Sequence, residues 1–166
     1  MRFQKITHFD TANGIGIRTV LWVQGCNHCC KECHNPQTWD INGGELFTDY
    51  EVEDILKSLE SPHIAGVTFS GGDPLHPNNR DDIMGLAKLI KKRFPDKTIW
   101  CYTGYKWDEV KKLKLIKYID VLVDGEFHIK EKDISLAFCG SKNQRIIDVK
   151  ESLKKRKVIL WRKDNI

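Results

Sequence analysis

Ile17-Arg-Thr-Val-Leu-Trp-Val23, followed by Gln24-Gly25-Cys26, is the stretch of sequence that decides the fold. It is rich in β-branched and apolar residues, which is typical of a buried strand, and the Gln-Gly pair ends it. Three later stretches have the same character, and glycine or aspartate follows each of them: Ile64–Phe69, Thr98–Tyr102 and Ile119–Val123. The sequence therefore predicts four buried strands with turn-forming residues after their carboxyl ends.

Helices are predicted after three of these strands. Thr48 and Glu51 form a capping box, Asn79 can cap a second helix, and Asp108 with Lys112 supports a third. The expected apolar faces are Val52, Ile55, Leu56 and Leu59 on the first helix, Ile83, Leu86, Ala87 and Ile90 on the second, and Val110, Leu113 and Ile116 on the third. The alternation of strand and helix predicts an α/β protein whose sheet is mostly parallel and forms an open sheet or a partial barrel. Beyond Glu126, only Val158–Trp161 is predicted as a strand.

Composition places the chain among globular proteins. Its 166 residues are 40% hydrophobic and 30% charged, with no internal repeat and no linker-like segment, so we expect a single domain over 1–166. We expect neither a secretion signal nor a membrane span, because no apolar run approaches the ~20 residues that cross a bilayer. The net charge of +4 comes from lysine-rich stretches, which we interpret as solvated helix faces. An acidic partner or a nucleic acid is the alternative reading of these lysines.

Cys26, Cys29, Cys30 and Cys33 lie within eight positions, too close together to pair with distant cysteines. Metal or redox chemistry in a reducing cytoplasm fits them better than disulfides do. A structural zinc site takes two separated cysteine pairs, and no second pair exists, since Cys101 and Cys139 are isolated. One loop can instead hold an iron–sulfur cube through three thiolates and leave one iron open, most simply through Cys26-x3-Cys30-x2-Cys33. A ligand set that uses Cys29 stays open.

The unusual residues all follow predicted strands. The cysteine loop, Ser70–Pro74, Thr103-Gly104 and Asp124-Gly125 each lie just after a carboxyl end. Parallel α/β sheets bind their ligands at this edge, so one site can contain all four segments.

Taken together, Cys26-Asn-His-Cys-Cys30-Lys-Glu-Cys33 and Ser70-Gly-Gly-Asp-Pro-Leu75 resemble the radical S-adenosylmethionine family. Further matches extend the resemblance over most of the chain, to its activating-enzyme branch: Gln24-Gly25-Cys26, Pro36–Trp39, Ile99-Trp100, Tyr102–Lys106, Asp120–Gly125 and Gly140–Arg145. The fold that this resemblance implies is an abbreviated, open radical-S-adenosylmethionine βα barrel.

The resemblance also implies site residues. Cys26, Cys30 and Cys33 would ligate a [4Fe-4S] cluster, and no side chain would be catalytic, because the cluster and S-adenosylmethionine carry the chemistry. The implied contacts to S-adenosylmethionine are the backbone of Glu32, Cys33 and His34 along the adenosine, and Gly71, Gly72 and Asp73 at the methionine end. Two positions depart from the family pattern: Glu32 stands where an aromatic or small residue is common, and Cys139 where arginine is usual.

The implied reaction is one-electron cleavage of S-adenosylmethionine to a 5′-deoxyadenosyl radical, which takes a hydrogen atom from a glycine of a partner protein. For this branch, the partner is the large subunit of the anaerobic ribonucleoside-triphosphate reductase, and a donor such as flavodoxin supplies the electron. Two other readings stay open. One is activation of another glycyl-radical enzyme, such as pyruvate formate-lyase. The other is a zinc-containing nucleic-acid-binding module, motivated by the cysteines and the positive charge.

Overall fold

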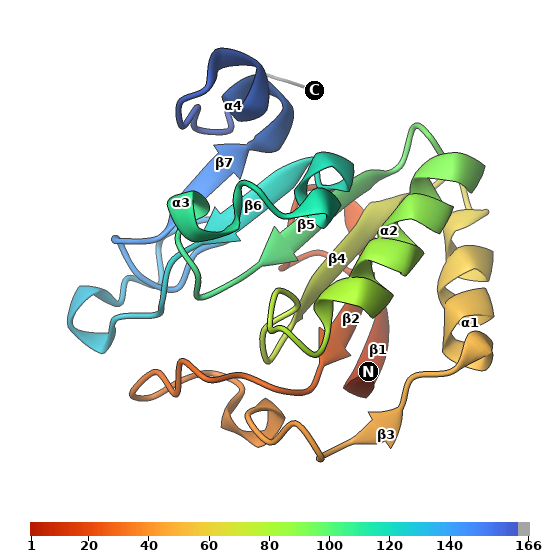
Figure 1. Ribbon diagram of the computed structural model, residues 1–166, viewed down its shortest axis with the longest axis horizontal. Helices are drawn as coiled ribbons and strands as arrows, with labels where there is room; N and C mark the ends of the chain where they lie inside the picture. Colours follow the sequence, from red (N-terminus) through yellow and green to blue (C-terminus); the bar gives the residue numbers. More distant parts are fainter. Residues whose placement is uncertain (163–166) are drawn as a thin grey trace.

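The computed structural model describes residues 1–162, which form one seven-stranded sheet with the order β3-β1-β2-β4-β5-β6-β7 (Figure 1). The strands are β1 (Arg2–Asp10), β2 (Ile17–Val23), β3 (Glu45–Leu46), β4 (Ile64–Gly71), β5 (Thr98–Tyr102), β6 (Val121–Asp124) and β7 (Arg145–Asp148). The α-helices are α1 (Asp49–Leu59), α2 (Arg80–Arg93), α3 (Trp107–Val110) and α4 (Val149–Lys155). Short 3-10 helices are η1 (Pro36–Thr38), η2 (Lys114–Tyr118) and η3 (Ile129–Glu131).

The middle of the sheet is parallel and its edges are antiparallel. Strands β2, β4, β5 and β6 pair in parallel, as the sequence predicts. Strand β1 runs antiparallel to both β2 and β3, and β7 runs antiparallel to β6. The prediction of an α/β protein with a mostly parallel, open sheet is confirmed, and the architecture agrees with a partial radical-S-adenosylmethionine barrel. No helix in residues 1–162 is long and apolar enough to cross a membrane.

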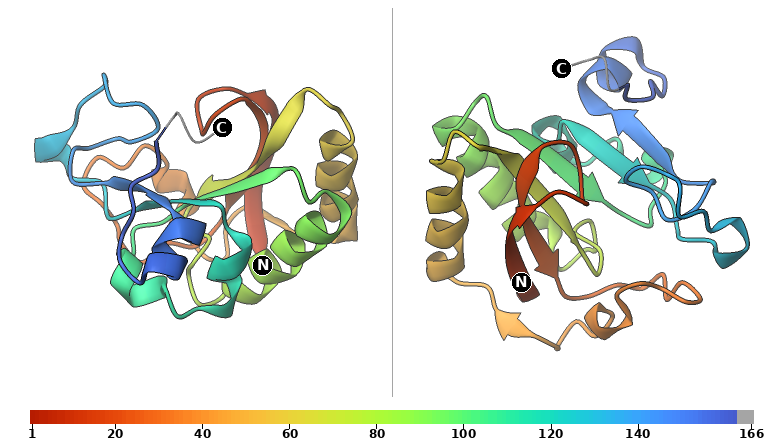
Figure 2. Two further views of the ribbon diagram at one scale, coloured as in Figure 1. Left: turned by 90° about the horizontal axis from the view of Figure 1, so that it is seen from above. Right: turned by 180° about the vertical axis from the view of Figure 1, so that it is seen from behind.

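The two faces of the sheet are covered differently. Helices α1 and α2 lie on one face, where the larger hydrophobic core forms around residues such as Leu21, Phe69 and Ile99 (Figure 1). From behind, the strands face the viewer and the two helices lie beyond them (Figure 2). On this second face a smaller cluster surrounds Trp100, whose ring packs edge-on against Phe138 and Trp161, each at 5.2 Å between ring centroids.

A fully buried arginine on β2 joins three strands. The Arg18 guanidinium donates to the Thr68 hydroxyl at 2.8 Å and to the Thr98 carbonyl at 2.9 Å, and it lies over the Trp100 ring. Desolvation lowers the pKa of Arg18 to about 10. Because the buried charge is surrounded by acceptors, it ties β2 to β4 and β5 at the end of the sheet opposite the cysteines.

Local signals predict α1, α2 and the four parallel strands, but other elements differ from the prediction. The capping box at Thr48 and Glu51 is present. Asn79 stands at the N-cap of α2, but its side chain donates to Gln24 and Asp73 carbonyls and not to the helix. The third helix breaks into α3 and η2, because Leu113 is extended and turns Leu115 and Ile116 into the core.

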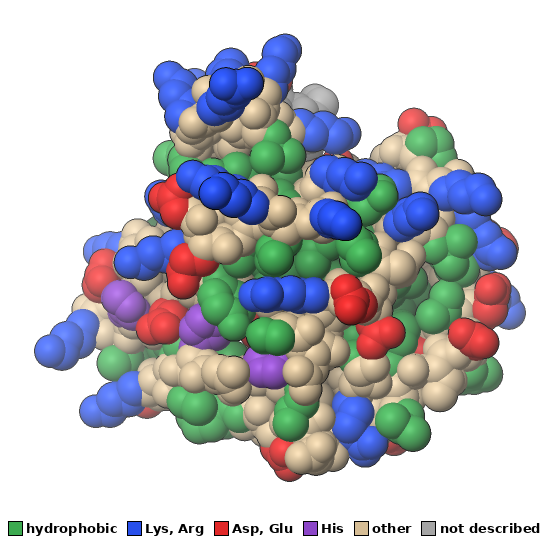
Figure 3. Space-filling view, viewed as in Figure 1, with side chains coloured by type: hydrophobic (Ala, Val, Ile, Leu, Met, Phe, Trp, Pro, Cys, Tyr) green, Lys and Arg blue, Asp and Glu red, His purple; other side chains and the backbone are tan. Residues whose placement is uncertain are grey.

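The other differences lie at the two ends of the chain. Val158–Trp161 forms only a single bridge, between Leu160 and Ile147, whereas β1, β7 and α4 were not predicted. The lysine-rich stretches are mostly solvated, and Figure 3 shows Lys and Arg side chains gathered around α4. Lys91 is an exception, because its partly buried ammonium pairs with the Asp120 carboxylate at 2.5 Å.

Candidate functional site

The predicted convergence of strand ends is present. A groove of about 390 Å³ lies at the carboxyl ends of β2, β4, β5 and β6, a volume suited to a small organic cofactor. Its walls come from the cysteine loop, from Ser70–Gly72, from Tyr102–Gly104 and from 125–127, and residues 136–144 close one side. One site therefore contains all four segments that the sequence singled out.

Three of the four clustered cysteines line this groove. Cys26, Cys30 and Cys33 are partly buried in its wall, whereas Cys29 is exposed and lies outside the lining. The backbone of the loop is irregular at the exposed cysteine, since Cys29 and Glu32 adopt left-handed φ angles of 47° and 57°. The Asn35 amide also donates to the Cys33 sulfur at 3.3 Å.

The stem of the cysteine loop is held by backbone hydrogen bonds. Gly25 N donates to the Thr38 carbonyl at 2.8 Å, and Asp73 N donates to the Gly25 carbonyl at 2.8 Å. The stem lies so close to the end of β4 that a Cβ at Gly72 would meet the Gly25 and Thr38 oxygens at 2.6 and 2.7 Å. Glycine at position 72 is therefore required by the protein's own packing, in addition to any ligand that approaches it.

Burial keeps two of the groove thiols protonated. Desolvation raises the pKa of Cys26 to about 11 and also raises the pKa of Cys30. A metal that binds these sulfurs must displace their protons, which is the usual coupling between metal binding and thiol ionisation.

Asp73 lies at the centre of a buried hydrogen-bond network. Its carboxylate is 1% exposed and accepts from the Leu75 and Gly104 amides at 2.8 and 3.0 Å and from the Thr103 hydroxyl at 2.9 Å. The fourth donor is the His28 ring, whose Nε2 lies 3.0 Å from Asp73 Oδ2. The side chain therefore faces into the protein and connects the ends of β4 and β5 with the cysteine loop.

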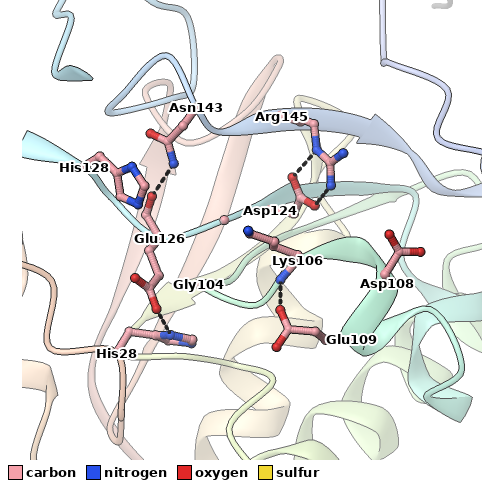
Figure 4. Close-up of a pocket in the computed structure, with 11 residues that line it drawn as sticks. His28, Gly104, Lys106, Asp108, Glu109, Asp124, Glu126, His128, Asn143 and Arg145 are labelled. Atoms are coloured by element: carbon pink, nitrogen blue, oxygen red, sulfur yellow. Dashed lines mark hydrogen bonds and ion pairs between the residues drawn. The ribbon is translucent and has the colours of Figure 1, made fainter. Parts of the chain in front are cut away.

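The His28 ring also reaches β6, since its Nδ1 lies 3.0 Å from Glu126 Oε1 (Figure 4). The hydrogen bond to Asp73 and the one to Glu126 raise the pKa of His28 to about 9, because each ring nitrogen must donate to a carboxylate. His28 separates the groove from a second, polar pocket of about 700 Å³, which Lys106, Asp124 and Arg145 also line. In that pocket Arg145 holds the buried Asp124 carboxylate through two hydrogen bonds of 3.0 and 2.5 Å (Figure 4).

Only some of the residues expected to contact S-adenosylmethionine line the groove. Cys33, His34, Gly71 and Gly72 line the groove, whereas Glu32 is exposed on the outer side of the loop. Among the groove residues that sequence reasoning missed is Phe127, whose ring lies 5.1 Å from that of His34. A signal for it existed, because Phe127 follows Asp124-Gly125 at the end of a predicted strand.

The donor set suits a cluster better than a single ion. Within residues 1–162, no three His, Cys, Asp or Glu side chains come close enough together to hold one metal ion. An iron–sulfur cube binds each cysteine at a different iron, so its ligands stand apart around a shared space. Cys26, Cys30 and Cys33 lie along one wall of the groove, and Cys139 lines it from the separate segment 136–144. The three thiols of the one loop fit a cube with one open iron.

The fold and this cysteine loop define a single-cluster iron–sulfur protein, and residues 12–147 match the family described as "4Fe-4S single cluster domain". Similar proteins of known name identify a particular family among these iron–sulfur proteins. The chain is 42% identical over 146 residues to the anaerobic ribonucleoside-triphosphate reductase-activating protein of Enterobacteria phage T4, covering 88% of this chain and 93% of the relative. The proteins of the same name from Haemophilus influenzae and Escherichia coli K12 are 44% and 42% identical, covering 82% and 87% of this chain and 91% and 96% of the relatives. The chain belongs to the family of anaerobic ribonucleoside-triphosphate reductase-activating proteins.

Proposed function

We propose that this protein binds a [4Fe-4S] cluster through Cys26, Cys30 and Cys33, cleaves S-adenosylmethionine and generates a glycyl radical on an anaerobic ribonucleoside-triphosphate reductase. The observation that carries this proposal is the groove itself. Three cysteines stand in one wall, glycines stand at the end of the neighbouring strand, and Cys29 is turned away. The names of the relatives supply the partner.

The chain's own residues bind and orient the cofactor. When bound, the cluster supplies one electron to the sulfonium of S-adenosylmethionine. Gly71 and Gly72 give the methionine end a wall without side chains, and the backbone of Glu32, Cys33 and His34 follows the adenosine. Phe127 offers an aromatic face on the same side, which compensates for the missing ring at position 32.

At the methionine end, the main role of Asp73 is to hold neighbouring parts of the protein in place. Its carboxylate already accepts from four protein donors, so little acceptor capacity is left for the ligand's ammonium group. We assign to Asp73 the placement of Gly72 and of the cysteine loop, together with a favourable negative charge close to the ammonium.

The partner and the electron donor follow from the same reaction. A glycine on a flexible loop of the reductase's large subunit would enter the groove, and a one-electron protein such as flavodoxin would reduce the cluster. Free thiols in the groove suit the reducing cytoplasm.

Anaerobic reconstitution tests the proposal. We expect about four irons and four sulfides per chain, an electron paramagnetic resonance signal that changes when S-adenosylmethionine is added, and formation of 5′-deoxyadenosine. Mixing with purified anaerobic reductase or with pyruvate formate-lyase then separates the two activases, because only the true partner acquires a glycyl radical. Stoichiometric zinc without iron or sulfide would refute the proposal and favour the nucleic-acid-binding alternative.

A further inference from the structure

The His28 side chain connects the cysteine loop with two strand ends. It is 12% exposed, and its two ring nitrogens reach Asp73 and Glu126, which follow β4 and β6. Between Asn27 and Glu32, no other non-cysteine side chain hydrogen-bonds to another element within residues 1–162. Among the non-cysteine side chains of the loop tip, this imidazole therefore makes the hydrogen bonds to the ends of the sheet.

The end of β5 is shaped to receive the same ring. A Cβ at Gly104 would meet three atoms of the His28 ring at 2.4 to 2.7 Å, so the imidazole lies directly against the glycine. The Tyr105 ring packs edge-on against the same imidazole, with ring centroids 4.7 Å apart. The Gly104 amide and the Thr103 hydroxyl then hold the Asp73 carboxylate that the ring contacts. Three strand ends thus contribute to one binding place for a single side chain.

We infer that His28 is a positioning residue that fixes the tip of the cysteine loop against the ends of β4, β5 and β6, and so holds the three groove cysteines in place before a cluster binds. His28 touches no reacting atom in this role. It acts through the loop, because His28 is two residues from Cys26 and two from Cys30. The loop's arrangement is then set by the protein, and the cluster enters a preformed site.

The physical reason is the cost of freeing the loop. Without His28, Asp73 keeps its three other donors, so the fold persists, but the loop tip loses the two side-chain hydrogen bonds that His28 makes to Asp73 and Glu126. An unattached tip samples many backbone conformations, and only a fraction of them presents the thiols correctly. Cluster binding must then pay for ordering the loop.

Amide hydrogen exchange of the cluster-free protein tests this directly. In His28→Leu we expect residues 27–32 to exchange about tenfold faster, while helix α2 exchanges at the parent's rate. Gly104→Ala is a second variant with His28 intact, because the added methyl displaces the ring, and it should give the same local increase. His8→Leu is the matched control: His8 also pairs with a carboxylate, Asp54 at 3.0 Å, but between β1 and α1.

The second readout is the rate at which a chelator removes iron from the reconstituted protein. We expect it to rise about tenfold in His28→Leu and Gly104→Ala and to stay within twofold in His8→Leu. His28→Gln, which keeps one donor, should fall between the parent and His28→Leu. Loop exchange and iron loss both unchanged in His28→Leu and Gly104→Ala would overturn the inference. So would a uniform increase in exchange over the whole protein, which indicates a general loss of stability.

The iron readout rests on the proposed function, since it needs a cluster, but the exchange readout does not. A failure to bind iron in the parent would count against the proposed function. Unchanged exchange in the variants would count against the role of His28 alone.

Discussion

Gly72 is the position where a single methyl group tests how the cysteine loop is held. In Gly72→Ala the new Cβ would lie 2.6 Å from the Gly25 oxygen and 2.7 Å from the Thr38 oxygen. Both neighbours are backbone atoms, so neither can move aside by rotating a side chain. The stem of the loop must shift away from β4, and the hydrogen bonds between Asp73 and Gly25 and between Gly25 and Thr38 lengthen.

The expected cost combines overpacking with these weakened hydrogen bonds. Overpacking by one methyl group costs about 1–3 kcal/mol, and a weakened backbone hydrogen bond adds about 0.5–1 kcal/mol. Because two such hydrogen bonds are weakened, we expect Gly72→Ala to lower the free energy of unfolding by about 2–5 kcal/mol. Since the free energy of unfolding of a domain is about 5–15 kcal/mol, we expect the variant to fold. The structural change is then concentrated at the stem of the loop.

Urea unfolding of the cluster-free protein measures this change, and iron per chain after reconstitution measures its effect on the site. Gly85→Ala is the matched control: Gly85 lies inside α2, and a Cβ there meets nothing within 4 Å. The control should gain about 0.5–1 kcal/mol, because alanine is the better helix former. If Gly72→Ala unfolds at the parent's urea concentration and retains full iron, the stem is not as tightly packed as the structure indicates.

Three further predictions concern other parts of the chain. Replacing Cys30 with alanine should abolish iron binding, whereas Cys29→Ala should retain it, and the opposite result would mean that Cys29 belongs to the ligand set. Replacing Arg18 with methionine removes a buried cation that holds several acceptors, so the free energy of unfolding should fall by about 3–5 kcal/mol in urea melts, with little change in the groove. Replacing Thr48 with alanine breaks a capping box and should cost about 1 kcal/mol, measurable by thermal unfolding, with iron content unchanged.

The elements with local signals were predictable from the sequence. The four parallel strands are rich in β-branched and apolar residues, and Thr48 with Glu51 marks the start of α1 by chemistry that lies within four residues. The convergence of the glycine and aspartate turns on one groove followed from parallel pairing alone, since it needs no knowledge of side-chain contacts. The ligand set Cys26, Cys30 and Cys33 stays a prediction, supported by their shared groove wall.

Other features depend on contacts between residues far apart in the chain. In strand β1, hydrophobic and polar residues alternate too weakly for the strand to be recognised from the sequence alone. It lies near the edge of the sheet, between β2 and the two-residue strand β3. The pairing of His28 with Asp73 and Glu126 spans 45 and 98 residues, and no spacing rule connects them. A histidine between two cysteines first suggests a metal ligand, and only the fold shows that its ring faces two carboxylates.

The two attachments of the cysteine loop meet at Asp73. Its backbone amide holds the stem through the Gly25 carbonyl, and its carboxylate holds the tip through His28. Both attachments come from one residue, Asp73. The end of β4 therefore holds the cysteine loop at its stem and at its tip. Serine at position 73 would keep the backbone amide that holds the stem, but it would lose the carboxylate that holds His28. The backbone shape of the turn alone therefore does not explain the aspartate. The requirement for aspartate follows from the loop it holds. Gly72 is required because the stem of that loop lies against it, whereas Gly71 is required by its positive φ of 105° and by the β2 backbone at Val23.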